Sequence, residues 1–139
     1  MSEPGTIVQS FYDNWRDGKV SESRPLFTDD AVIVTPAGTM GIDAHEQMGH
    51  AFMDAFPDSH MAVSRMVTVG DEVWVTGSFR GTQTGDLVGE QGTIPASSRA
   101  IDVPFAEVFT VRDGRISRQE TYWDQMTMMA QIGALPAPA

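Results

Sequence analysis

The feature that most constrains the fold is a 13-residue segment, residues 100–112, in which apolar side chains alternate with other residues. The odd positions are apolar except for one: Ile101, Val103, Phe105, Phe109 and Val111. This alternation predicts a strand with one buried face. Asp113-Gly114 is a turn signal, and residues 115–123 continue as a partner strand. Two long strands joined in this way predict an antiparallel sheet whose apolar face must be covered.

The first half of the chain has helical periodicity instead. Apolar residues recur at helical spacing over residues 7–15, and Asp17-Gly18 ends this helix. A short strand is expected at residues 31–35. A second helix is expected to begin with Asp43 as its N-cap and Glu46 three residues later, and it should end before Pro57.

Between the second helix and the long strand, alternation predicts two more strands, residues 61–69 and 73–79. Residues 81–98 are rich in Gly, Thr and Ser, so we expect a loop there, with residues 84–99 as a mobile cover over a pocket. Helices followed by consecutive hairpins predict an α+β fold. We expect a curved antiparallel sheet with helices packed on one face, which together enclose a cone-shaped pocket.

Composition narrows the choice of partners. The 139 residues suit one domain, residues 1–139, with a flexible tail from about residue 134. The net charge of −10 disfavours nucleic acid and anionic membrane surfaces, and no apolar run is long enough to cross a bilayer. Met1 to Thr6 lack the features of a secretion signal, and there is no cysteine. We therefore expect a cytoplasmic protein with a small-molecule partner.

Glu107 interrupts the apolar face of the long strand. Burial among apolar neighbours favours the neutral form of a carboxyl group unless a partner compensates. Two interpretations remain open at this point. Glu107 is either a buried structural residue held by an arginine or a backbone N–H, or a cavity-facing general acid or base.

The strand pairing decides which residues surround Glu107. A two-residue turn at Asp113-Gly114 would place Glu107 opposite Glu120, which is unfavourable. A bulged turn would instead pair Glu107 with Gln119, and we adopt that register. The remaining pairs would then be Phe105 with Thr121 and Val103 with Trp123. The predicted wall of the pocket is mostly apolar with a few polar groups, as is usual for ligand sites: Phe105, Glu107, Phe109, Gln119, Thr121 and Trp123.

Three other candidate site residues each allow two interpretations. Tyr12 and Trp15 share the face of the first helix, where Tyr12 is either a core residue or a hydrogen-bond donor to the ligand. Asp124 is either the N-cap of a short helix over residues 125–132 or a catalytic carboxylate. His60 is either an exposed rim residue or a ligand contact near the pocket. The histidines lack metal-ligand spacing, so no metal site is predicted.

Several segments resemble the SnoaL-like polyketide cyclase group of the nuclear-transport-factor-2-like (NTF2-like) superfamily. They are spread over nearly the whole chain and include Ala55-Phe56-Pro57-Asp58, Gly70-Asp71, Arg80-Gly81-Thr82-Gln83-Thr84-Gly85, residues 108–116, Tyr122-Trp123-Asp124-Gln125 and Gln131-Ile132-Gly133. The resemblance implies a cone-shaped fold, a homodimer packed sheet to sheet, and acid–base chemistry without a cofactor. Cyclases of this group close rings by an intramolecular aldol step with an Asp and a His. Thr121 and Glu107 stand at the matching positions here, and Gln83 replaces a second His.

Two functions follow from these observations. The first is a cyclase- or isomerase-type enzyme that acts on a small hydrophobic carbonyl compound. Its catalytic residues would be Glu107 as general base with Gln119, Thr121 and Tyr12, and its substrate contacts would be Trp15, Phe105, Phe109, Trp123 and His60. The second is a non-catalytic protein that binds a small apolar molecule in the same pocket.

Overall fold

The structure, a computed structural model, describes residues 3–89 and 92–135. The predicted flexible tail therefore lies outside the described residues from residue 136 onward. The helices are α1 (Glu3–Arg16), the 3₁₀ helix η1 (Val20–Leu26), α2 (Ile42–Ala55) and α3 (Gln125–Gln131). The strands are β1 (Phe27–Thr35), β2 (Gly38–Met40), β3 (His60–Val69), β4 (Glu72–Thr82), β5 (Leu87–Gly89), β6 (Gly92–Ile94), β7 (Ala100–Arg112) and β8 (Arg115–Trp123).

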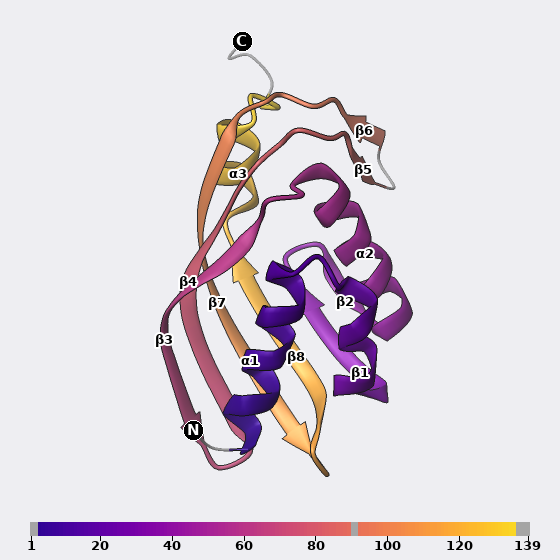
Figure 1. The fold of residues 1–139 in the computed structure, drawn as a ribbon, viewed down its shortest axis with the longest axis vertical. Helices are drawn as coiled ribbons and strands as arrows, with labels where there is room; N and C mark the ends of the chain where they lie inside the picture. The colour runs from indigo at the N-terminus through magenta and orange to yellow at the C-terminus, as the bar shows by residue number, and fades with distance from the viewer. Residues whose placement is uncertain (1–2, 90–91, 136–139) are drawn as a thin grey trace.

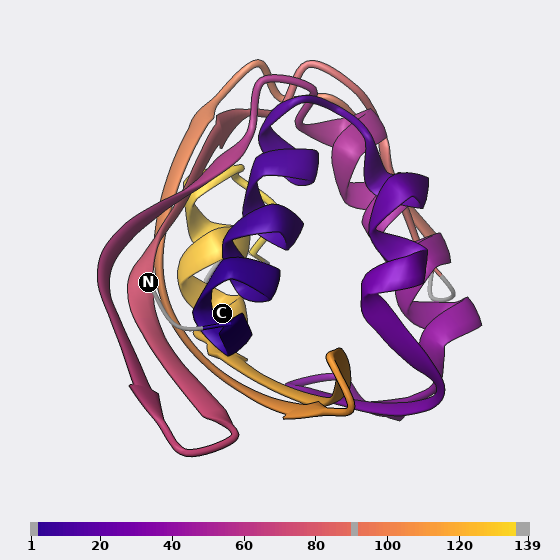
Figure 2. The same cartoon turned by 60° about the horizontal axis from the view of Figure 1, so that its bottom comes forward.

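The main sheet has six strands in the order β2-β1-β8-β7-β4-β3. Every neighbouring pair is antiparallel except β1 and β8, which run parallel. The sheet curves, and α1 and α2 lie on its concave side (Figure 1, Figure 2). The predicted α+β fold is confirmed, and the one parallel pairing is the departure from the expected antiparallel sheet.

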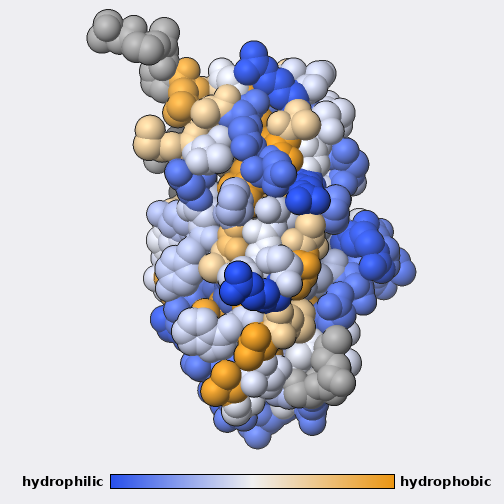
Figure 3. All heavy atoms as spheres, turned by 90° about the vertical axis from the view of Figure 1, so that its left-hand side faces the viewer, coloured by the Kyte–Doolittle hydropathy of each residue, from blue (hydrophilic) through white to orange (hydrophobic). Residues whose placement is uncertain are grey.

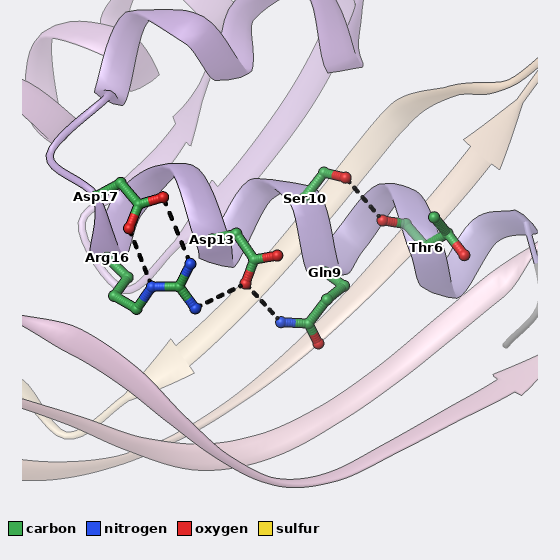
Figure 4. Close-up of polar contacts among 6 residues, drawn as sticks. All are labelled: Thr6, Gln9, Ser10, Asp13, Arg16 and Asp17. Atoms are coloured by element: carbon green, nitrogen blue, oxygen red, sulfur yellow. Dashed lines mark hydrogen bonds and ion pairs between the residues drawn. The ribbon is translucent and has the colours of Figure 1, made fainter.

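The core lies between the helices and the concave face. From α1, Val8, Phe11 and Tyr12 are buried against Phe109 of β7 and its neighbours. The opposite face of α1 is only partly buried, and side chains on it form local contacts (Figure 4). There Gln9 donates to Asp13 over 2.9 Å, and the Ser10 hydroxyl donates to the Thr6 carbonyl. The helix is therefore amphipathic, as its periodicity predicted.

The sequence predicts N-caps for two helices, α2 and α3, and the structure contradicts the first and confirms the second. The N-cap of α2 is Gly41, so the predicted capping box is wrong. Asp43 instead forms an ion pair with Arg24 of η1 at 2.7 Å. Asp124 does cap α3, since its carboxylate accepts from the backbone N–H groups of Met126 and Thr127. The capping interpretation of Asp124 is confirmed.

The predicted register of β7 and β8 is wrong by two residues. Both Asp113 and Gly114 have positive φ, 52° and 78°, so the turn is a tight two-residue turn rather than the predicted bulged turn. The extra residue is Ser117 inside β8, where the pairing shifts. Glu107 consequently lies opposite Thr121, with Phe105 opposite Trp123 and Phe109 opposite Gln119. The bulge keeps Glu107 away from Glu120 and leaves the predicted set on one face.

The segment predicted as a pocket cover is a small hairpin, β5–β6, and it lies beside α2 rather than over the cavity. Gln83 is completely buried and holds the end of this hairpin in place. Its side-chain amide donates to the backbone carbonyls of Ile94 and Pro95. No described residue between 84 and 99 lines the pocket, so the predicted cover is not found there.

Candidate active site

A cavity of about 140 Å³ lies between the concave face of the sheet and the helices α1, η1 and α2. Its wall is mostly apolar. Aromatic rings come from the helices and from the sheet, among them Trp15, Phe52, Phe79, Phe105 and Trp123. Such a wall suits a flat apolar ligand, whose orientation the few polar groups would set.

Glu107 projects from β7 into this wall and is only 6% exposed. The Tyr12 hydroxyl donates to its Oε1 over 2.8 Å, and the Gln119 amide donates to its Oε2 over 2.7 Å. Among the described residues, no Lys, Arg or His forms an ion pair with this carboxylate. The arginine that the structural interpretation offered as one possible partner is therefore not found among the described residues, and the side chains that hold Glu107 are neutral.

Burial raises the pKa of Glu107 above its usual value. Hydrogen bonds from Tyr12, Gln119 and Thr121 oppose that effect because they stabilise the charged form. Burial, followed by the neighbouring Glu107, raises the pKa of Tyr12 far above its usual value, so the phenol keeps its proton. The result is a carboxyl group with increased proton affinity, held in one orientation by donors that do not titrate with it.

The structure brings most of the predicted site residues together. Glu107, Gln119, Thr121, Trp15, Phe105 and Trp123 all line the cavity. Three predicted residues do not line it. Tyr12 lies behind Glu107, Phe109 is fully buried in the core, and His60 is exposed at the start of β3. Tyr12 can therefore position the carboxylate. The predicted ligand contacts of Phe109 and His60 are wrong, because neither residue lines the cavity.

His45 of α2 is the site residue that the sequence analysis missed. It lines the cavity, and burial lowers its pKa to about 4. The signal was available, because His45 lies at helical spacing between two buried residues of α2, Ile42 and Gly49. The absence of metal-ligand spacing, which is all that was considered for His45, says nothing about this position on the helix.

The side-chain oxygen of Gln119 is a buried acceptor without a partner among the described residues. One of the two amide N–H groups of Gln119 is used by Glu107. Gln119 in this orientation holds the carboxylate with one N–H and keeps its second N–H and its oxygen for other partners.

The described part of the chain contains no cluster of three side chains that could hold a metal ion. Nor does any described helix have the length and apolar character needed to cross a membrane.

Solved structures with the same fold include three that cover nearly the whole chain. A candidate SnoaL-like polyketide cyclase from Jannaschia sp. CCS1 is 24% identical, with a TM-score of 0.83 over 96% of this chain and 94% of its own. IdmH of Streptomyces antibioticus, a candidate polyketide cyclase, is 26% identical, with a TM-score of 0.79 over 95% and 99%. A protein of ketosteroid isomerase-like fold from Catenulispora acidiphila is 21% identical, with a TM-score of 0.75 over 94% and 93%.

No curated protein sequence matches the chain significantly. The sequence pattern of one family, described as SnoaL-like polyketide cyclase, matches residues 6–132. That match spans every strand of the six-stranded sheet and all but the first residues of the helices that enclose the cavity. The chain belongs to the SnoaL-like polyketide cyclase family.

Proposed function

We propose that this protein is a cofactor-independent enzyme of the cyclase or isomerase type, with Glu107 as its general base. The observation that carries the proposal is a buried carboxylate on the sheet wall of an aromatic cavity, held by Tyr12 and Gln119 without a compensating cation. The substrate would be a small hydrophobic carbonyl compound, since the wall offers apolar contacts with few polar ones.

In the proposed reaction, Glu107 accepts a proton from the carbon next to the carbonyl group, and the C–H electron pair forms an enolate. Desolvation raises the pKa of Glu107 and makes it a stronger base than an exposed carboxylate. Return of the proton to another carbon would complete an isomerisation. Attack of the enolate carbon on a second carbonyl would instead close a ring, and the resulting alkoxide would take the proton back from Glu107. Tyr12 acts only as a positioning residue, because it contacts the carboxylate and does not line the cavity.

Deuterium exchange tests this proposal with 2-tetralone, a bicyclic ketone with acidic C–H groups beside its carbonyl. We expect the wild-type protein to accelerate loss of the C1 proton signal in deuterated water, measured by NMR. Glu107→Gln keeps the shape of the side chain and should reduce exchange to the background rate. Asp124→Asn is the control, because Asp124 caps α3 and does not line the cavity, and Asn also caps well.

The result distinguishes the two functions considered from the sequence. If wild type binds 2-tetralone without accelerating exchange, the non-catalytic binding protein is the better description. If Asp124→Asn loses exchange while Glu107→Gln retains it, the assignment of the base is wrong.

A further inference from the structure

Proton removal beside a carbonyl leaves negative charge on the ligand's oxygen, and a hydrogen-bond donor in the site would stabilise that charge. This inference rests on the proposed function, because it asks which residue supplies the donor. The sheet wall offers little. Gln119 already gives one amide N–H to Glu107, so the donors left there are its second N–H and the hydroxyl of Thr121, and both lie beside the base itself.

The two indole N–H groups on the cavity wall are also committed. Nε1 of Trp15 donates to the Ser59 hydroxyl over 3.0 Å, and Nε1 of Trp123 donates to the side chain of Gln125 over 2.8 Å. Both indoles can therefore provide an apolar surface to a ligand without offering it a donor.

His45 is different from these residues. It lines the cavity from α2, and neither of its ring nitrogens has a hydrogen-bond partner in the described part of the chain. Its ring is held between Phe11 and Phe27, at centroid distances of 6.1 and 5.5 Å. Because burial lowers the pKa of His45 to about 4, the ring is neutral near pH 7 and carries one N–H donor.

We infer that His45 donates a hydrogen bond to the carbonyl oxygen of the ligand, from the helical wall of the cavity, while Glu107 acts from the sheet wall. A neutral imidazole can polarise a carbonyl in this way. The ligand would then contact polar groups at two points: a C–H group at the Glu107 carboxylate and its oxygen at His45 of α2. The pocket would thus select carbonyl or enol compounds over hydrocarbons of the same shape.

Two other groups on the cavity wall compete for this role. The Ser23 hydroxyl accepts a hydrogen bond from Asn14 over 3.1 Å, which leaves its own O–H available to donate to a ligand. Arg24 has two acidic partners, Asp43 at 2.7 Å and Glu46 at 3.7 Å. Ser23→Ala is therefore included in the test as the competing donor, and Arg24 is the weaker competitor because its charge is compensated.

Binding of 2-naphthol and 2-methylnaphthalene tests the inference. The two compounds have nearly the same shape, and the hydroxyl of 2-naphthol stands where the oxygen of the 2-tetralone enol would be. We expect wild type to bind 2-naphthol about tenfold more tightly, which corresponds to about 1.4 kcal/mol. His45→Phe preserves the ring contacts with Phe11 and Phe27 and should remove this preference. Ser23→Ala and the exposed-site control His60→Gln should keep it.

Nitrogen-15 NMR of the histidine side chains gives a second readout that a structural role would not change. In wild type, 2-naphthol should shift the ring nitrogens of His45 and leave those of the exposed His60 unchanged, whereas 2-methylnaphthalene should have little effect on the nitrogens. This measurement does not depend on the folding of a variant.

Two results would overturn the inference: a 2-naphthol preference that survives in His45→Phe, or no shift of the His45 nitrogens on binding. Loss of the preference in Ser23→Ala alone would also overturn it and assign the donor to η1. Failure of the proposed function gives a different result. Wild type would then show no deuterium exchange of 2-tetralone above background, whichever residue binds the ligand's oxygen.

Discussion

At the scale of single residues, the hydrogen bonds around Glu107 decide how strong a base it is. Tyr12 donates to one of its oxygens and lowers its pKa, which opposes the larger effect of burial. Tyr12→Phe removes that donor and leaves the ring in place. We expect the pKa of Glu107, followed by carbon-13 NMR of its carboxyl group, to rise further above its usual value.

The sign of this expectation follows from charge. The phenol donates more strongly to the carboxylate than to the neutral acid, so its loss favours protonation. Trp15→Phe is a matched control, since it also trims an aromatic residue of α1 but the Trp15 indole bonds to Ser59 rather than to the carboxylate. An unchanged pKa in Tyr12→Phe would mean that this bond has no influence on the base.

Individual site residues could be predicted only in part. Alternation placed Glu107 and Gln119 on the cavity face, because side-chain direction in a strand is fixed by parity. Parity cannot tell a cavity wall from the packed core beneath it, so Phe109 was assigned to the wall although it is fully buried. The partner of Tyr12 is 95 positions away in the chain, at Glu107, and no local pattern encodes such a contact.

At the scale of elements, the β7–β8 hairpin shows why its face was predicted correctly and its register was not. The expected bulge was at the turn and the observed one is at Ser117, which shifts each cross-strand partner by two positions. A shift of two residues leaves every side chain on its face, whereas a shift of one would invert them. The composition of the wall could therefore be predicted even though the pairs could not.

Deletion of Ser117 tests this account of the hairpin. Without the extra residue, Ile116 and Arg118 become neighbours, and the two-residue turn leads directly into the pairing of Glu107 with Thr121. We expect the variant to fold and to retain ligand binding in the cavity, with a melting temperature a few degrees below that of wild type.

Deletion of Glu120 is the contrasting variant. It would turn Thr121 and Trp123 to the outer face, so we expect loss of ligand binding and severe destabilisation, both measurable by thermal melting and 2-naphthol titration. If the two deletions behave alike, parity does not control the site.

At the scale of the whole molecule, the change from helical to alternating periodicity was enough to predict the α+β layers. The outer face of the sheet, opposite the cavity, is the part that this fold leaves uncovered. Val67, Val69, Trp74 and Tyr122 are each more than half exposed. Apolar patches among polar residues are visible on the side of the molecule that carries β3 and β4 (Figure 3).

We propose that a second copy of the chain covers this outer face, as was expected from the sequence. The face also carries Arg65 of β3, Glu72 of β4 and the ion pair of Arg118 with Glu120 on β8, so two copies related by a twofold axis could pair opposite charges. A net charge of −10 on each copy opposes association, and salt should screen that repulsion. The resulting dimer should therefore be stronger at higher ionic strength.

Light scattering across micromolar concentrations tests the dimer. We expect the mass of two chains for wild type, and a shift toward monomer in Trp74→Asp, which places a charge in the middle of the exposed apolar residues. Loss of one central aromatic contact should weaken association by about thirtyfold or more. Val88→Asp is the matched control, because Val88 is 60% exposed but lies on β5, outside the main sheet. A monomer mass at every concentration, or equal weakening by both variants, would contradict a dimer formed through the sheet.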